Sequence, residues 1–121
     1  MIRITVPVDP HRTALNQRLH WAVRAKRTAR ARALARLAWL AAGGPVAAGP
    51  VRVSVIIRRA RSLDPDGIWA GLKPAIDGIF REGVTPDDSA RWIRLGEITQ
   101  ETHNRWLGRE EVEFVIETEA Q

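Results

Sequence analysis

The chain has 121 residues, which suits one domain and is too short for two ordinary ones. Hydrophobic residues make up 45% and charged residues 27%, a composition that excludes global disorder. The absence of cysteine excludes disulfides, thiolate metal sites and a cysteine nucleophile. Because no apolar stretch approaches the ~20 residues that span a bilayer, and the chain begins without a signal-peptide pattern, we expect a cytoplasmic protein.

Charge is divided unevenly along the chain. Residues 1–61 hold 13 Lys or Arg and one acid, whereas residues 62–121 hold six and 13, so net charges of +12 and −7 sum to +5. Arg accounts for 17 of the 19 basic residues, and its planar guanidinium binds phosphate through two hydrogen bonds. A polyanionic partner is therefore one interpretation, and a solvated basic surface is the other.

The first third of the chain predicts a strand and a helix. Residues 1–8 alternate apolar and polar residues and contain a proline, which is typical of a short edge strand. We expect residues 16–27 to form a basic loop, because a helix running through them would place Arg30 in the middle of its apolar stripe. The helix is therefore predicted to begin near Thr28, as N-cap, and to end at Ala42, before a Gly-Gly-Pro sequence.

The rest of the chain predicts three strands, a helix and a turn-rich loop. Alternating apolar residues predict strands over 51–58, 92–99 and 111–118, with a helix over 69–80 and a loop over 83–89. The order strand, helix, strand, helix, strand, strand predicts one small α+β domain over residues 1–121. It would have two main helices on a mixed or antiparallel sheet of about four strands.

Aromatic residues and histidines carry weaker signals. Core packing is the favoured interpretation for Trp39, Trp69, Trp92 and Trp106. Stacking on unpaired bases is the alternative for three aromatic residues, His20, Trp21 and Trp69. The histidines at 11, 20 and 103 lack metal-ligand spacing. The glycines at 43 and 44 follow a helix, which is wrong for a phosphate-binding loop, so we expect no nucleotide cofactor.

Two acidic pairs are the candidates for chemistry. Asp64 and Asp66 follow the second strand, and residues two apart in extended backbone project to the same side. Asp-Pro-Asp-Gly is equally a good turn sequence, and Asp87 and Asp88 also suit an Asx-turn or a helix cap. Together, carboxylates from two loops at one end of a sheet would suit a Mg²⁺ site.

Lys73 lies on the predicted helix after the first acidic pair. Its ammonium would suit a scissile phosphate or a leaving oxygen, as electrostatic stabilisation of phosphoryl transfer requires. A structural salt bridge with Asp77, four residues on, is the equal alternative.

One segment resembles a known family. Residues 58–93, RRARSLDPDGIWAGLKPAIDGIFREGVTPDDSARWI, are similar to the RusA family of Holliday-junction resolvases, and residues 15–21, LNQRLHW, resemble that family's Asn-Arg stretch. The resemblance implies a small α/β fold and a homodimeric, Mg²⁺-dependent endonuclease that makes paired nicks in four-way DNA junctions. Mn²⁺ is the expected substitute ion. This chain departs from the family in having Gly67 where Asn is usual, and in a small insertion over residues 68–71.

The resemblance also implies roles for individual residues. The catalytic and metal-binding carboxylates fall on Asp64, Asp66 and Asp88, and the essential basic residue falls on Lys73. Asp77 matches a helix position that is structural or that supports the metal ligands. The basic residues expected to contact DNA are Arg18, Arg24, Lys26, Arg27, Arg30, Arg58, Arg59 and Arg61. Such a protein would associate with the nucleoid when bound to DNA.

Two other functions fit parts of the pattern. A non-catalytic, basic DNA-binding module would use the aspartates only as turn residues. Another metal-dependent phosphoryl-transfer enzyme, such as a nucleotidyltransferase, would share the Asp-x-Asp sequence, but its usual phosphate-binding loop is absent from the sequence.

Overall fold

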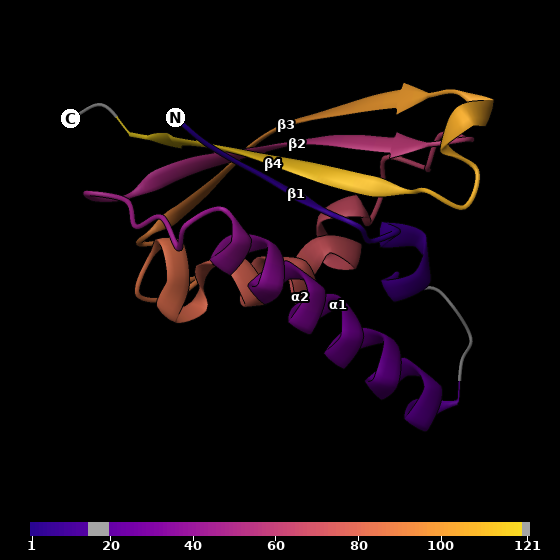
Figure 1. The fold of residues 1–121 in the computed structure, drawn as a ribbon, viewed down its shortest axis with the longest axis horizontal. Coiled ribbons are helices and arrows are strands. Elements are labelled where there is room, and N and C mark those ends of the chain that lie inside the picture. Colours follow the sequence, from indigo (N-terminus) through magenta and orange to yellow (C-terminus); the bar gives the residue numbers. More distant parts are fainter. Residues whose placement is uncertain (15–19, 120–121) are drawn as a thin grey trace.

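Four strands form a mixed sheet that is covered on one face by helices (Figure 1). The computed structural model describes residues 1–14 and 20–119. The strands lie in the order β1-β4-β2-β3, in which β2 and β3 are parallel and β4 is antiparallel to both β1 and β2. Their bounds are Ile2–Val6 for β1, Val51–Arg59 for β2, Ile93–Thr102 for β3 and Glu111–Thr118 for β4. The predicted α+β fold, with a four-stranded mixed sheet and two main helices, is confirmed.

Alternation along the strands sets which face of the sheet enters the core. In the central strand β2, Val51, Val53, Val55 and Ile57 are buried and point to the helices. Val55 lies opposite Phe114 of β4 in the antiparallel register, and Phe114 is also fully buried. Burial of each such side chain stabilises the fold by roughly 1.5–3 kcal/mol.

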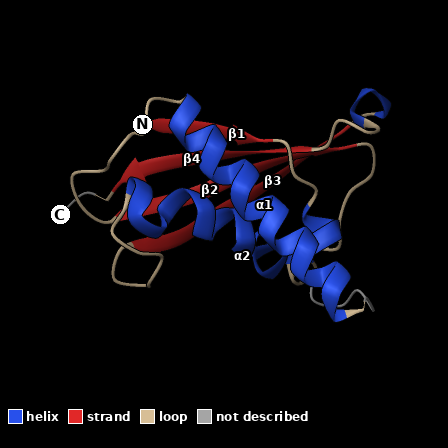
Figure 2. Cartoon of the chain, turned by 60° about the horizontal axis from the view of Figure 1, so that its bottom comes forward, coloured by secondary structure: helices blue, strands red, loops and turns tan. Residues whose placement is uncertain are grey.

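Two helices cover this face of the sheet (Figure 2). They are α1, Trp21–Ala41, and α2, Ile68–Ile79. They pack so closely that a Cβ atom built on Gly78 of α2 would lie 2.3 Å from the carbonyl oxygen of Arg32 in α1. Glycine at this position therefore allows the two backbones to touch.

The predicted start of the first helix near Thr28 is wrong, because α1 begins at Trp21. The Nδ1 atom of His20 caps it by accepting a hydrogen bond of 3.2 Å from the N–H of Ala22. Residues 20–27 of the expected basic loop are thus the cap and first turns of the helix, and residues 15–19 lie outside the described residues.

The buried face of α1 explains the error. Its buried residues are Ala31, Ala35 and Trp39, a narrow stripe with a spacing of four residues. Arg30 lies outside this stripe and is exposed, so it does not interrupt the helix. Alanine carries little hydrophobic signal, whereas Val23 and Leu37, which have a stronger one, are exposed to solvent. No helix in residues 1–14 and 20–119 is both long and apolar enough to cross a bilayer.

The tryptophans agree only in part with the expectation of core packing. Trp39 belongs to the core, and Trp69 and Trp92 pack against it, as predicted. Trp106 does not, because it lies half-buried in a short 3-10 helix, η3 (Asn104–Trp106). Its ring stacks with two guanidinium groups, at 4.7 Å from Arg105 and 6.0 Å from Arg58.

Candidate active site

The loop after β2 places two aspartates at the start of α2. Asp64 Oδ1 accepts a hydrogen bond of 3.0 Å from the N–H of Asp66, which closes an Asx-turn. Gly67 follows with φ of 80°, a left-handed conformation that favours glycine, and α2 begins at the next residue. The turn interpretation of Asp-Pro-Asp-Gly is confirmed. Both carboxylates nevertheless remain exposed, so the turn leaves them accessible to a ligand.

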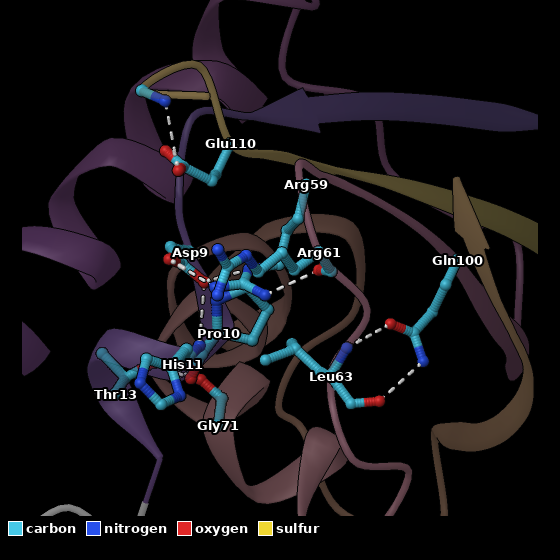
Figure 3. A network of polar contacts seen from close by, with 11 residues as sticks. Asp9, Pro10, His11, Thr13, Arg59, Arg61, Leu63, Gly71, Gln100 and Glu110 are labelled. Carbon is cyan, nitrogen blue, oxygen red and sulfur yellow. Dashed lines mark hydrogen bonds and ion pairs between the residues drawn. The ribbon is translucent and has the colours of Figure 1, made fainter. Parts of the chain in front are cut away.

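Contacts from both sides hold this loop in position (Figure 3). The side-chain oxygen of Gln100 in β3 accepts a hydrogen bond of 2.7 Å from the N–H of Leu63, and its amide nitrogen donates one of 3.0 Å to the carbonyl oxygen of Leu63. Arg59, at the end of β2, donates to the carbonyl oxygen of Arg61 at 2.7 Å and to Asp9 Oδ1 at 2.9 Å. The acidic loop is therefore joined to two neighbouring segments of the fold.

A short 3-10 helix, η1 (Pro10–Thr13), lies against this loop and α2. Asp9 caps it by accepting a hydrogen bond of 3.0 Å from the N–H of His11, and the hydroxyl of Thr13 donates to the carbonyl oxygen of Gly71 (Figure 3). Together η1 and the loop enclose a cavity of about 320 Å³. We call it the acidic pocket, and its lining residues are Pro10, His11, Ala14, Arg59, Arg61, Ser62, Leu63, Asp64, Asp66, Gly67 and Ile68.

A second charged cluster lies on α2 and the loop before β3. Lys73 donates to Asp88 and forms an ion pair of 3.2 Å with Asp77. Arg32 of α1 also lies 3.7 Å from Asp77. The structural salt bridge predicted between Lys73 and Asp77 is therefore confirmed, and Asp88 shares the same ammonium. We call Lys73, Asp77 and Asp88 the lysine cluster.

The carboxylates of the lysine cluster have opposite pKa shifts. Burial, together with a hydrogen bond to Asp88, raises the pKa of Asp77. That hydrogen bond and the Lys73 ammonium lower the pKa of Asp88 to about 2. The hydrogen bond to Asp88 also raises the pKa of Lys73. Asp88 is thus ionised at neutral pH, whereas Asp77 is the member of the pair that favours a proton.

The side chains fit a magnesium ion in part. Mg²⁺ binds through one or two carboxylates, with water and substrate phosphate completing its shell, and Asp64 and Asp66 offer such a pair. Among the described residues, no group of three or more His, Cys, Asp or Glu side chains is close enough to hold one ion. Asp88, paired with Lys73, therefore does not join Asp64 and Asp66 here, and a site shared by all three stays a prediction.

The predicted DNA-contacting residues lie in different places. Arg59 and Arg61 line the acidic pocket, whereas Arg24, Lys26, Arg27 and Arg30 lie on α1. Arg18 lies outside the described residues.

Arg58 is not part of the acidic pocket. It bonds Glu101 at 3.1 Å, Glu111 at 2.9 Å and Glu113 at 2.7 Å. These carboxylates raise its pKa further above the ordinary arginine value. Because alternate residues of β2 project to opposite faces, Arg58 lies on the face of the sheet away from buried Ile57. Its contact with DNA therefore stays a prediction, and its visible role is to join β2, β3 and β4.

Sequence reasoning missed His11 and Asp9. His11 was set aside for lack of metal-ligand spacing, yet it lines the acidic pocket. Asp9 was only one acid in a basic segment, yet it caps η1 and pairs with Arg59. Asp9-Pro10 is a recognisable capping sequence, but its contact with residue 59 depends on tertiary structure.

No family model, no curated protein and no solved structure matches the chain.

Proposed function

We propose that the chain is a Mg²⁺-dependent endonuclease that resolves four-way DNA junctions by paired nicks. The observation that carries the proposal is the acidic pocket, where exposed Asp64 and Asp66 share one cavity with Arg59 and Arg61. Carboxylates suit a hard cation and guanidinium groups suit phosphate, so the pocket offers ligands for both the metal and the DNA backbone. The junction as substrate, and DNA recombination and repair as its setting, rest on the resemblance of residues 58–93 to the RusA family.

Each residue of the pocket has a distinct part in the proposed reaction. Asp64 and Asp66 would hold Mg²⁺, which when bound activates water and stabilises charge on the phosphoryl oxygens. Arg61 is exposed and would contact the phosphate directly. Arg59 bonds both Asp9 and the Arg61 carbonyl, and would therefore keep the backbone of Arg61 in place.

The lysine cluster would act beside this pocket. Lys73 is more than half exposed, with 57% of its side chain accessible, so its ammonium can reach a phosphate or a leaving oxygen. Such a movement would free the ionised Asp88, the third carboxylate of the proposed metal site.

A homodimer follows from the proposed substrate. A four-way junction has two equivalent strands to cut, and a two-fold symmetric enzyme would present one metal site to each. Binding to DNA would also place the protein at the nucleoid.

A non-catalytic DNA-binding module is the second candidate. It is favoured by the structural contacts that the aspartates make, since Asp64 closes the Asx-turn and Asp88 pairs with Lys73. In this function the acidic loop only shapes the start of α2. Binding would depend on salt, and no divalent ion would produce a cut.

A labelled synthetic four-way junction, incubated with and without Mg²⁺ or Mn²⁺, separates the two candidates. We expect paired symmetric nicks that require the metal, that are absent from a linear duplex, and that disappear in Asp66→Asn while junction binding is retained. Asp87→Asn is the matched control, because Asp87 is half-buried in the same loop and its carboxylate accepts a hydrogen bond of 2.8 Å from the N–H of Ser89. Binding without cleavage in either metal would contradict the nuclease proposal, as would normal cleavage by Asp66→Asn.

A further inference from the structure

A second cavity lies on the other side of η1. Its volume is about 680 Å³, and it is bounded by η1, by the middle of α1 and by the segment between η3 and β4. Four arginines from these three segments line it, namely Arg12, Arg27, Arg30 and Arg109. We call this cavity the arginine groove. Of its arginines, Arg12 and Arg109 were not among the DNA contacts expected from the sequence.

The carboxylates of the groove already have partners. Asp9 pairs with Arg59 at 2.9 Å, and Glu111 pairs with Arg58 at 2.9 Å. Glu110 accepts a hydrogen bond of 3.2 Å from the N–H of Gly108 (Figure 3). Asp9 and Glu111 are therefore neutralised by arginines that do not line the groove, whereas Glu110 keeps its negative charge in the lining.

Three of the groove arginines are exposed, and no carboxylate in the described part of the chain neutralises them. Within residues 1–14 and 20–119, Arg12, Arg30 and Arg109 form no ion pair with a carboxylate. A concave surface with several unneutralised guanidinium groups attracts a polyanion, and each planar fork matches a phosphate.

The groove and the acidic pocket share a wall. Asp9, Arg12 and Thr13 face the groove, whereas Pro10 and His11 face the acidic pocket. A DNA strand that lies in the groove would therefore pass over η1 to reach Asp64 and Asp66.

We propose that the arginine groove binds backbone phosphates of the DNA beside the acidic pocket, with Arg12, Arg30 and Arg109 as the contacts. The proposal rests on the proposed function only in taking DNA as the polyanion. In this proposal the short helix η1 separates the acidic pocket, where the DNA is cut, from the arginine groove, where the DNA backbone is bound.

A charge-matched pair of double variants tests the groove. Arg30→Gln/Arg109→Gln removes two charges from two of its walls. Arg52→Gln/Arg94→Gln removes two exposed charges from the sheet, at neighbouring positions of β2 and β3. Binding of a labelled four-way junction is measured in EDTA over a series of salt concentrations, and thermal unfolding verifies that both variants fold as the parent does.

We expect the groove variant to bind about 10- to 60-fold more weakly near 0.1 M salt, because two phosphate contacts change the slope of log K against log salt by about 1.8. The sheet variant should bind as the parent does. Equally weakened junction binding in both variants, or unchanged binding in the groove variant, would contradict the proposal that the arginine groove binds DNA. Polyglutamate that competes as well as DNA at equal charge would overturn DNA as the occupant.

The outcomes also separate this inference from the nuclease proposal. A parent that binds through the groove but never cuts in Mg²⁺ or Mn²⁺ supports the groove and contradicts the nuclease. A parent that cuts junctions while the groove variant binds them unchanged supports the nuclease and contradicts the groove.

Discussion

The acidic pocket and the lysine cluster each contain two aspartates, but the carboxylates are paired with a cation only in the lysine cluster. In the lysine cluster, Asp77 and Asp88 both form ion pairs with the Lys73 ammonium, and Arg32 also lies 3.7 Å from Asp77. In the acidic pocket, Asp64 and Asp66 are exposed and form no ion pair with any described residue. The difference indicates that the ion pairs of the lysine cluster contribute to stability, whereas the carboxylates of the acidic pocket are available to an external cation.

The largest effect is expected where the backbones of α1 and α2 pack closely, at Gly78. Gly78→Ala would place a methyl group 2.3 Å from the Arg32 carbonyl and force α1 and α2 apart. We expect a loss of about 3 kcal/mol in the free energy of unfolding, measured with urea. Gly49→Ala is the control, since its Cβ would meet nothing within 4 Å. Similar stability of both variants would refute the close contact.

Asp88→Asn should lower the free energy of unfolding by less than Gly78→Ala does, and the loss should depend on pH. The folded protein lowers the pKa of Asp88 to about 2, so its ionised form stabilises the fold above the unfolded value of about 4. This contribution is lost as pH falls through 2. Because Lys73 is largely exposed, we expect about 1 kcal/mol at pH 7, and a difference between parent and variant that vanishes near pH 2. A constant difference across this range would exclude the ionic origin.

Asp77→Asn should raise the free energy of unfolding, whereas Asp88→Asn should lower it. A raised pKa means that the fold favours protonated Asp77, and this preference is lost as pH rises through the folded pKa. An asparagine amide keeps a donor for Asp88 without the buried charge. We expect the variant to equal the parent at low pH and to gain up to about 0.5 kcal/mol at pH 7. Chemical denaturation of parent and variant at low pH and at pH 7 measures this difference. A loss of stability in the variant at pH 7 would show that the ion pairs of Asp77 outweigh the cost of burying its charge.

Asp66→Asn should have the smallest effect on stability, even though it is the proposed cause of lost cleavage. The side chain is exposed, and its N–H, not its carboxylate, closes the Asx-turn. We expect its free energy of unfolding to stay within about 0.5 kcal/mol of the parent. A thermal melt tests this, and a clear destabilisation would identify Asp66 as a structural residue like Asp88.

The sequence predicted the parts of the fold that depend on local pattern. Alternation identified β2 and β4, and the buried faces of both are the ones that the pattern indicated. The start of α1 was wrong because its contact with α2 is made by alanine and glycine, which give almost no hydrophobic periodicity. Helices that meet through small residues are difficult to delimit from one sequence.

The candidate site was predictable only within single loops. Asp64 and Asp66 were placed correctly after β2, and the Lys73–Asp77 pair followed from its spacing of four residues. The proximity of His11 to the aspartates was not predictable, because η1 is held against α2 by the bond from Thr13 to Gly71. That contact joins positions 58 residues apart.

The position of β1 at the edge of the sheet has a consequence for local unfolding of the protein. Its five residues pair with β4 from Ile2 opposite Ile116 to Val6 opposite Val112, and η1 follows directly. Contacts between such distant parts of a chain form late in folding, and short edge strands are among the first to fray. Release of β1 alone would leave η1 bound to α2 and β2 through the Thr13–Gly71 and Asp9–Arg59 contacts, so loss of the wall between the two cavities requires those contacts to break as well. Amide hydrogen exchange measured at β1 and at η1 would report whether the two segments open together.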